Sequence, residues 1–226
     1  MPSGVIAYSF MRHKRIRFDL TRKLYQSIIN TLVLPDARAK VAIAGECFTK
    51  YPDNPEKRDT VDLYVSTNHK DTMHEQLNSS EQQMASMLAE VNNILITSVD
   101  TLLVGDEFNR NIICQTTPQS HTVSWFDANR EKQSRQVTVK ILFTIQEMDK
   151  IDSLLTMFQL EPCKMAYKDG KFYFSDWFVR GGPIIAEGHE PSLELINKYL
   201  QKGFKHTMST GWAAFCYDNN QYYGKL

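Results

Sequence analysis

Apolar residues recur with two different periods along this chain, and that combination restricts its fold class. In residues 18–34, Leu20, Leu24, Ile28 and Leu32 follow one another every four positions, which is typical of one face of an α-helix. In residues 136–145, apolar residues occupy every second position, which is typical of a β-strand. A chain with both patterns belongs to the α/β or α+β class.

The remaining patterns predict a mixed sheet flanked by helices. Residues 41–44 form a short apolar run closed by Gly45, and residues 61–65 form a second strand. A Lys-Asp-Gly turn at 168–170 joins two further strands, at 163–167 and 171–174. Residues 71–91, 149–158 and 191–201 have helical patterns, and 94–104 and 112–113 are strand-like. The polar stretch 115–134 is predicted to be an insertion loop.

Composition excludes several classes of protein. The 226 residues carry 26 basic and 26 acidic side chains, so no overall positive charge holds nucleic acid non-specifically. No apolar run is long enough to cross a membrane, and no secretory leader is recognisable. The chain is therefore expected to be intracellular, in the cytoplasm or the nucleus.

The four cysteines, Cys47, Cys114, Cys163 and Cys216, are far apart and form no C-x-x-C pair. A zinc knuckle is therefore not expected, and Cys163 is expected to be a packed thiol rather than a nucleophile. The six histidines are equally scattered and suggest no metal site.

A strand that ends in glycine, followed by a loop and a strand with an aspartate, is part of the arrangement that nucleotidyl transfer requires. Two carboxylates on one face of a strand must be spaced D-x-D, because strand side chains alternate. Together they hold two metal ions that activate the attacking hydroxyl and bind the triphosphate. Here Gly45 closes the first strand and Asp62 lies in the second.

These segments, VAIAGE at 41–46 and TVDLYV at 60–65, resemble the nucleotidyltransferase pattern. Downstream, FQLEPCK at 158–164, YKDGKFY at 167–173 and KYLQKGFK at 198–205 resemble a branch of uncharacterised nucleotidyltransferase-like proteins from large DNA viruses and some fungi. The resemblance spans residues 20–206. It implies a nucleotidyltransferase-like fold, a viral source and, in an active member, magnesium.

The departures from this pattern fall on the residues that would do the chemistry. Glu46 stands where a small residue should admit triphosphate, and Thr60 replaces the first aspartate of the pair. Gln159 replaces a further acid, although Glu161 is near enough in sequence to substitute for it. Asp62 remains, either as a residual metal ligand or as an acceptor of backbone hydrogen bonds. Gly45, Glu46, Thr60, Asp62, Gln159 and Glu161 are thus interpreted as a vestigial site without a cofactor. The alternative is a divergent, magnesium-dependent enzyme that uses Asp62 and Glu161.

An inactive site moves the expected function to the protein's surfaces. We divide the chain into an N-terminal arm (1–17), the nucleotidyltransferase-like domain (18–206) and an aromatic tail (207–226). The tail residues expected to mediate assembly are Trp212, Phe215, Cys216, Tyr217, Tyr222 and Tyr223. The chain is expected to form a homo-oligomer or a larger assembly, as a viral structural, matrix or occlusion-type protein. Membrane and nucleic acid are not expected as partners.

Overall fold

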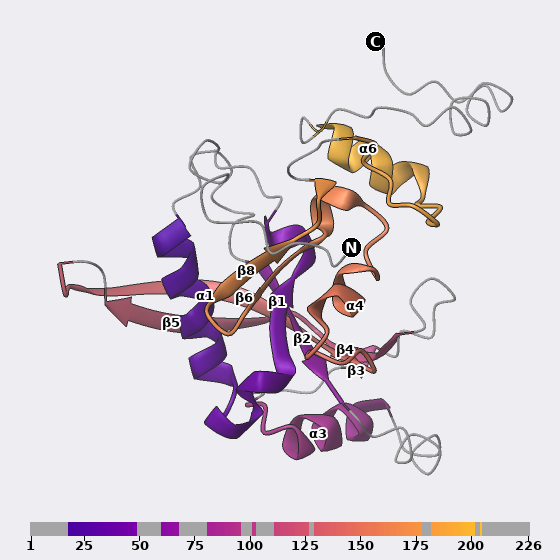
Figure 1. Ribbon diagram of the computed structural model, residues 1–226. Coiled ribbons are helices and arrows are strands. Elements are labelled where there is room, and N and C mark those ends of the chain that lie inside the picture. Colours follow the sequence, from indigo (N-terminus) through magenta and orange to yellow (C-terminus); the bar gives the residue numbers. More distant parts are fainter. Residues whose placement is uncertain are drawn as a thin grey trace, which may run out of the picture.

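The computed structural model describes residues 18–48, 60–67, 81–95, 101–102, 111–126, 129–177, 182–201 and 204 (Figure 1). The arm at 1–17 and the tail at 207–226 lie outside the described residues, and so do the candidate assembly residues of the tail. The helices are α1 (Phe18–Leu32), α3 (Glu81–Val91), α4 (Ile151–Leu155) and α6 (Leu193–Gln201). The strands are β1 (Val41–Ala44), β2 (Thr60–Ser66), β3 (Thr101–Leu102), β4 (Ile112–Thr116), β5 (Gln119–Phe126), β6 (Lys132–Thr144), β7 (Met165–Lys168) and β8 (Lys171–Phe174).

The strands of the described part form one mixed sheet of eight, in the order β3-β4-β6-β2-β1-β7-β8, with β5 also paired to β6. The central pair, β2 and β6, is parallel, and the other neighbours are antiparallel. The long strand β6 pairs with β5 through its first half and with β4 through its end. The predicted mixed sheet flanked by helices is therefore confirmed.

Helix α1 packs on one face of this sheet, and the sheet curls around it (Figure 1). Its apolar stripe contributes Leu24, Ile28 and Leu32 to the main core, together with inward residues of the central strands. On one side, the Ser27 hydroxyl donates to the carbonyl of Ser124 in β5 at 2.6 Å. On the other side, the Tyr167 hydroxyl of β7 donates to Gln26 at 3.0 Å. The helix therefore ties together two strands that are distant in the sheet order.

Part of the opposite face of the sheet, around β1 and the ends of β2 and β6, is covered by α4 and its flanking turns. Ala42, Ala44, Tyr64 and Leu142 meet Leu154 and other α4 residues in a second apolar cluster. A third cluster joins the turn at Leu160 to Ile196 and Tyr199 of α6. These two clusters place the 158–163 segment beside the end of β1, where the candidate site was expected.

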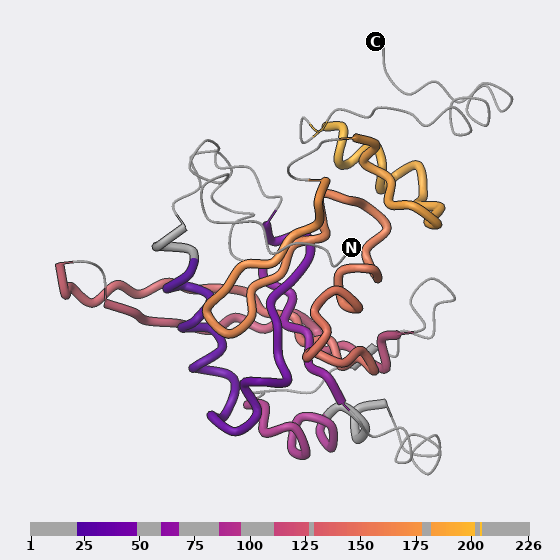
Figure 2. The backbone as a smooth tube through the Cα atoms, in the orientation of Figure 1, coloured from indigo at the N-terminus to yellow at the C-terminus, as the bar shows by residue number. Residues whose placement is uncertain are grey.

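The prediction of an insertion loop at 115–134 is wrong. These residues include the end of β4, all of β5 and the start of β6, and β5 and β6 form a long hairpin that projects from the body of the molecule (Figure 2). The inward positions of β5 include Gln119, His121 and Trp125 besides Val123, so polar and aromatic residues concealed the period of two. The backbone pairing with β6, and not an apolar alternation, defines this strand.

Several predicted boundaries move by a few residues. The first helix ends at Leu32 and not at residue 34, because Val33 pairs with Ile94 in an isolated bridge. The helix predicted at 149–158 is shortened to Ile151–Leu155, and the one at 191–201 begins at Leu193. The strand at 163–167 begins at Met165, because Cys163 belongs to a 3-10 turn, Glu161–Cys163. Of the predicted helix at 71–91, only Glu81–Val91 lies in the described part.

The predicted turn at 168–170 is confirmed. Asp169 and Gly170 both have positive φ, at 48° and 74°, between the paired strands β7 and β8. Two successive residues with positive φ are typical of the tight turns that match the twist of a hairpin.

No helix of the described residues is long and apolar enough to cross a membrane.

Candidate functional site

Gly45 and Asp62 meet because β1 and β2 pair directly. The antiparallel register aligns Ala44 with Asp62, and Gly45 follows Ala44 at the end of β1. The two strands are thus neighbours in one sheet, and α1 packs on one face of that sheet. Gly45 opens a 3-10 turn, Gly45–Phe48, with φ at +87°, a conformation that favours glycine over any residue with a side chain.

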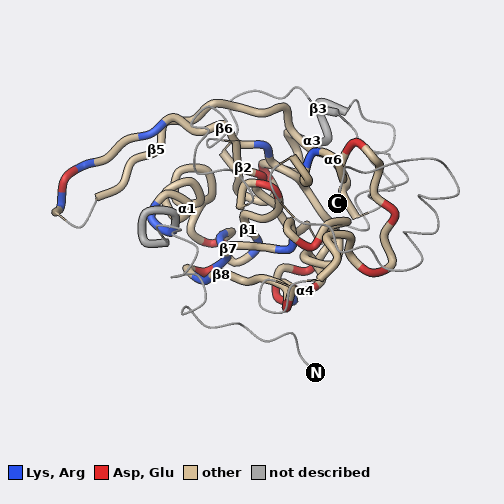
Figure 3. The backbone as a smooth tube through the Cα atoms, turned by 90° about the horizontal axis from the view of Figure 1, so that it is seen from above, with Lys and Arg blue, Asp and Glu red and all other residues tan. Residues whose placement is uncertain are grey.

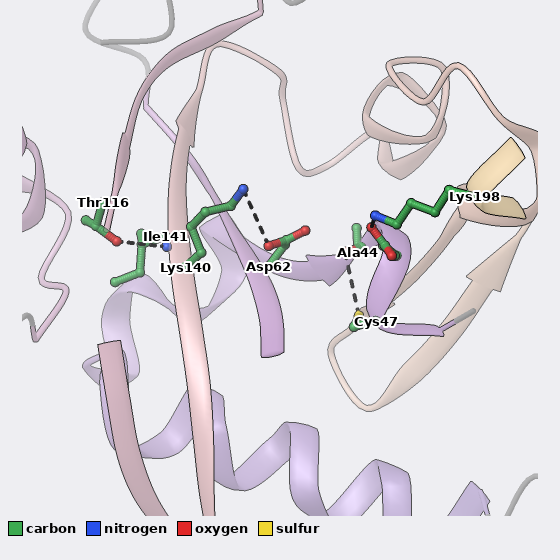
Figure 4. A network of polar contacts seen from close by, with 8 residues as sticks. Ala44, Cys47, Asp62, Thr116, Lys140, Ile141 and Lys198 are labelled. Carbon is green, nitrogen blue, oxygen red and sulfur yellow. Dashed lines mark hydrogen bonds and ion pairs between the residues drawn. The ribbon is translucent and has the colours of Figure 1, made fainter. Parts of the chain in front are cut away.

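A lysine of the parallel neighbour lies beside Asp62. The register of β2 and β6 aligns Asp62 with Lys140, and the lysine Nζ lies 3.9 Å from Asp62 Oδ1 (Figure 4). Both side chains remain partly accessible, with exposed fractions of 23% for Asp62 and 29% for Lys140. Tyr64 follows on the same face of β2, and burial, together with the charge of Asp62, raises its pKa well above the usual value.

The other position of the expected D-x-D pair, Thr60, lies where the pattern predicted. It is aligned with Thr138 of β6 and is exposed on the same face as Asp62. The face thus presents one carboxylate, one ammonium group and two hydroxyls. At a separation of about 4 Å and an effective dielectric constant of about 20, the Lys140 ammonium group would repel a bound metal ion by up to about 4 kcal/mol for each unit of the metal's charge. This set does not fit two magnesium ions.

Packing at Gly45 explains the glycine without a phosphate. A Cβ added there would lie 2.8 Å from Cε1 of Phe158 and 3.2 Å from its Cζ. The same ring meets Tyr64 edge to face, with the centroids 5.8 Å apart. The space beside the glycine is therefore filled by an aromatic side chain of the segment that follows α4. The glycine permits this close packing.

Glu46, the anion expected to oppose a triphosphate, forms an ion pair with α6. Lys198 Nζ lies 2.7 Å from Glu46 Oε2 and donates a hydrogen bond to it. The exposed fractions of the two side chains, 48% for Lys198 and 33% for Glu46, make this a surface pair worth at most about 1 kcal/mol. Its structural consequence is to connect the end of β1 to the last helix, which belongs to the third apolar cluster.

The two downstream candidates serve the local structure of their own segment. Glu161 uses one carboxylate oxygen for Lys164, at 2.7 Å, and the other accepts from the Ser175 hydroxyl, at 2.8 Å. The backbone carbonyl of Gln159 accepts a hydrogen bond from the backbone N–H of Ala186, at 2.9 Å. Glu161, which its place in the sequence made a candidate for the acid missing at Gln159, is thus paired with a lysine and a serine.

Cys163 is buried, as predicted for a packed thiol. Its Sγ lies 2.7 Å from the Tyr199 hydroxyl, inside the cluster that connects α6 to the 158–163 segment.

Cys114 is a second buried thiol, and burial raises its pKa to about 12. Among the described residues, no three His, Cys, Asp or Glu side chains lie together in a way that could hold a metal ion.

Sequence reasoning missed Lys140. It stands in the strand with the clearest alternation, on the face opposite the apolar positions, so its orientation was readable. Its proximity to Asp62 could not be predicted, because the two residues are 78 positions apart and nothing in the sequence indicates that β6 pairs in parallel with β2. The neighbour of Asp62 is therefore a consequence of strand order.

The comparisons with known proteins assign no family. No protein-family model matches the chain, and no curated protein or solved structure matches it significantly. The likeness to nucleotidyltransferases accordingly stays a prediction from the motifs at 41–46, 60–65, 158–164, 167–173 and 198–205.

Proposed function

We propose that this chain is a catalytically inactive, nucleotidyltransferase-like protein that acts through binding or self-assembly. The observation that carries the proposal is the ammonium group of Lys140 beside the Asp62 carboxylate. Nucleotidyl transfer needs a second carboxylate, which Thr60 does not supply, and the Lys140 ammonium group repels the metal that the remaining carboxylate would hold. The partners of Glu161 count against the divergent enzyme, since its carboxylate would have to leave Lys164 and Ser175.

Without catalysis, the function belongs to surfaces. Balanced charge favours self-association, since 26 basic and 26 acidic residues leave no net repulsion between copies. Under this proposal the shared fold is a rigid support, and the aromatic tail beyond it supplies contacts with neighbouring copies. A structural, matrix or occlusion-type role in a virus is consistent with such an arrangement.

A transfer assay tests the catalytic part of the proposal. The full chain is incubated with each labelled nucleoside triphosphate, with magnesium or manganese, and with nucleic-acid, protein and water acceptors. We expect no transfer above that of a heat-denatured sample. Incorporation of label that disappears in an Asp62→Ala variant, and persists in a Glu147→Ala surface control, would establish the enzyme instead. Glu147 is suited to this control because it forms an exposed ion pair with Lys150.

A further inference from the structure

The face of β5, β6 and β2 that points away from α1 is an open, polar platform. On β5 and β6 it consists of the even-numbered residues 120–126 and 132–140, and on β2 of residues 60 and 62. The odd-numbered residues of the same strands point toward α1 and its core, as shown by the burial of Val123, Val137 and Val139. We call this surface the polar face. It includes Asp62 and Lys140 of the candidate site.

Hydroxyl groups lie in register across the polar face. One row joins Ser120, Thr138 and Thr60 on three adjacent strands. A second pairs Thr122 with Gln136. In a third row, the Ser124 hydroxyl donates to that of Ser134 at 3.3 Å. Neighbouring strands are spaced by about 4.8 Å, and successive rows by about 7 Å, so these groups form a regular grid of donors and acceptors.

The two ends of the polar face differ from its centre. At the hairpin end, Phe126 is 65% exposed, the largest exposed fraction among the apolar side chains of the described residues. At the other end, the Asp62 carboxylate and the Lys140 ammonium group lie side by side and offset each other's charge. No charged residue occupies the face between that pair and Lys132. In Figure 3, the charged residues of the hairpin accordingly gather toward its outer end.

We propose that the polar face binds a neutral, polyhydroxylated ligand, namely an oligosaccharide or glycan chain. A sugar ring offers a C–H face that stacks on an aromatic ring, and Phe126 presents such a ring. Its hydroxyls need partners that both donate and accept, which serine and threonine supply. Lys132 and Lys140 are eight residues apart on β6, about 27 Å at strand spacing, which accommodates several sugar units. This inference rests on the proposed function, because it assigns the vestigial site to binding.

The charge of the polar face distinguishes this ligand from other partners. Nucleic acid requires several cations against its phosphates, whereas the centre of the face is uncharged and Lys140 already has a carboxylate beside it. A second copy of the chain would bury hydroxyls against hydroxyls, which removes little apolar area from water. A lipid surface would find Phe126 as the single exposed apolar side chain on this face.

Titration calorimetry on the full-length chain tests the inference. The probes are neutral oligomers of glucose, N-acetylglucosamine, mannose and xylose, with heparin fragments and oligothymidine for comparison. We expect one neutral series to bind with a dissociation constant on the order of a millimolar or tighter, because exposed polar contacts compete with water. Phe126→Ala should weaken this binding at least tenfold. Thr122→Val preserves the β-branched shape and removes a hydroxyl, so it should weaken binding about fivefold.

Val91→Ala is the matched control, because Val91 is an apolar side chain of similar exposure on α3, 52% exposed. Binding should be unchanged in this variant, and unfolding curves confirm that all three variants fold. Three outcomes would overturn the inference: no binding of any neutral oligomer, binding of heparin or oligothymidine alone, or glycan binding that neither face variant weakens. None of them depends on nucleotide transfer. A chain that binds glycan and also transfers nucleotides would refute the proposed function and leave this inference standing.

Discussion

Replacement of Gly45 by alanine tests whether packing, and not phosphate binding, requires the glycine. Two costs follow from the structure. The φ of +87° costs an L-residue about 1–2 kcal/mol, and the new Cβ would lie 2.8 Å from Cε1 of Phe158. Insertion of a methyl group into a packed interior costs about 1–3 kcal/mol, because the ring must shift against Tyr64. We expect Gly45→Ala to lower the free energy of unfolding by about 2–5 kcal/mol.

Gly188 provides a matched control for the backbone contribution. It has a similar φ of +78°, and an added Cβ would meet nothing within 4 Å. Gly188→Ala should therefore show the conformational cost alone, about 1–2 kcal/mol. Any gain from a less flexible unfolded chain is common to both variants and cancels in the comparison.

Urea unfolding, followed by circular dichroism and linear extrapolation, measures both variants. The difference between them isolates the contact with Phe158. In a Phe158→Leu background, the additional loss at Gly45 should shrink, since the smaller side chain removes the ring atoms that the Cβ would meet. If Gly45→Ala is no more destabilising than Gly188→Ala, the packing argument is refuted and the glycine must be explained otherwise.

Three further predictions concern titration, thiol reactivity and assembly. Burial lowers the pKa of His121, so the unfolded chain binds a proton at this histidine more readily than the folded chain. The free energy of unfolding should therefore fall as the pH drops below about 6.5, and it should fall less in His121→Gln than in His189→Gln. Urea midpoints at pH 7.5 and 5 measure this difference. Cys114, with a pKa raised to about 12, should resist maleimide at pH 8 until the chain unfolds, whereas the partly exposed Cys47 should react before it, as mapped by mass spectrometry; equal labelling rates for Cys47 and Cys114 would contradict this. Deletion of residues after Thr210 should leave the domain folded and lower its assembly state in sedimentation; a full-length chain that is monomeric at high concentration, with and without reductant, would refute assembly.

The order of strands within the sheet could not be read from the sequence. Local patterns placed β1 and β2, because short apolar runs and glycine exits are properties of neighbouring residues. The parallel pairing of β2 with β6 joins residues 60–66 to 138–144 and depends on how the whole sheet closes. That pairing puts Lys140 beside Asp62, and it changes the interpretation of the candidate site more than any single motif does.

The hairpin of β5 and β6 marks a second limit of sequence reasoning. Its residues alternate between a face against α1 and an open face, but the inward positions include His121 and Trp125, so no apolar period appears. The strand is stabilised by backbone pairing with β6 and by Ser27 and Lys23 of α1, which donate to its outer carbonyls. The two contacts with α1 join residues about a hundred positions apart, and a local pattern carries no trace of them.

By itself, the sequence determined the class of this protein, its central helices and strands, the turn at Asp169 and Gly170, and that position 60 is a threonine without a carboxylate. Each of these follows from residue type or from spacing within a few positions, where backbone geometry and side-chain chemistry act directly. Only the tertiary structure decided what surrounds Asp62, why Gly45 must be glycine, and that a row of hydroxyls spans three strands. Those features arise where segments distant in sequence are brought within a few ångströms, and the free energy that selects such an arrangement is summed over the entire core.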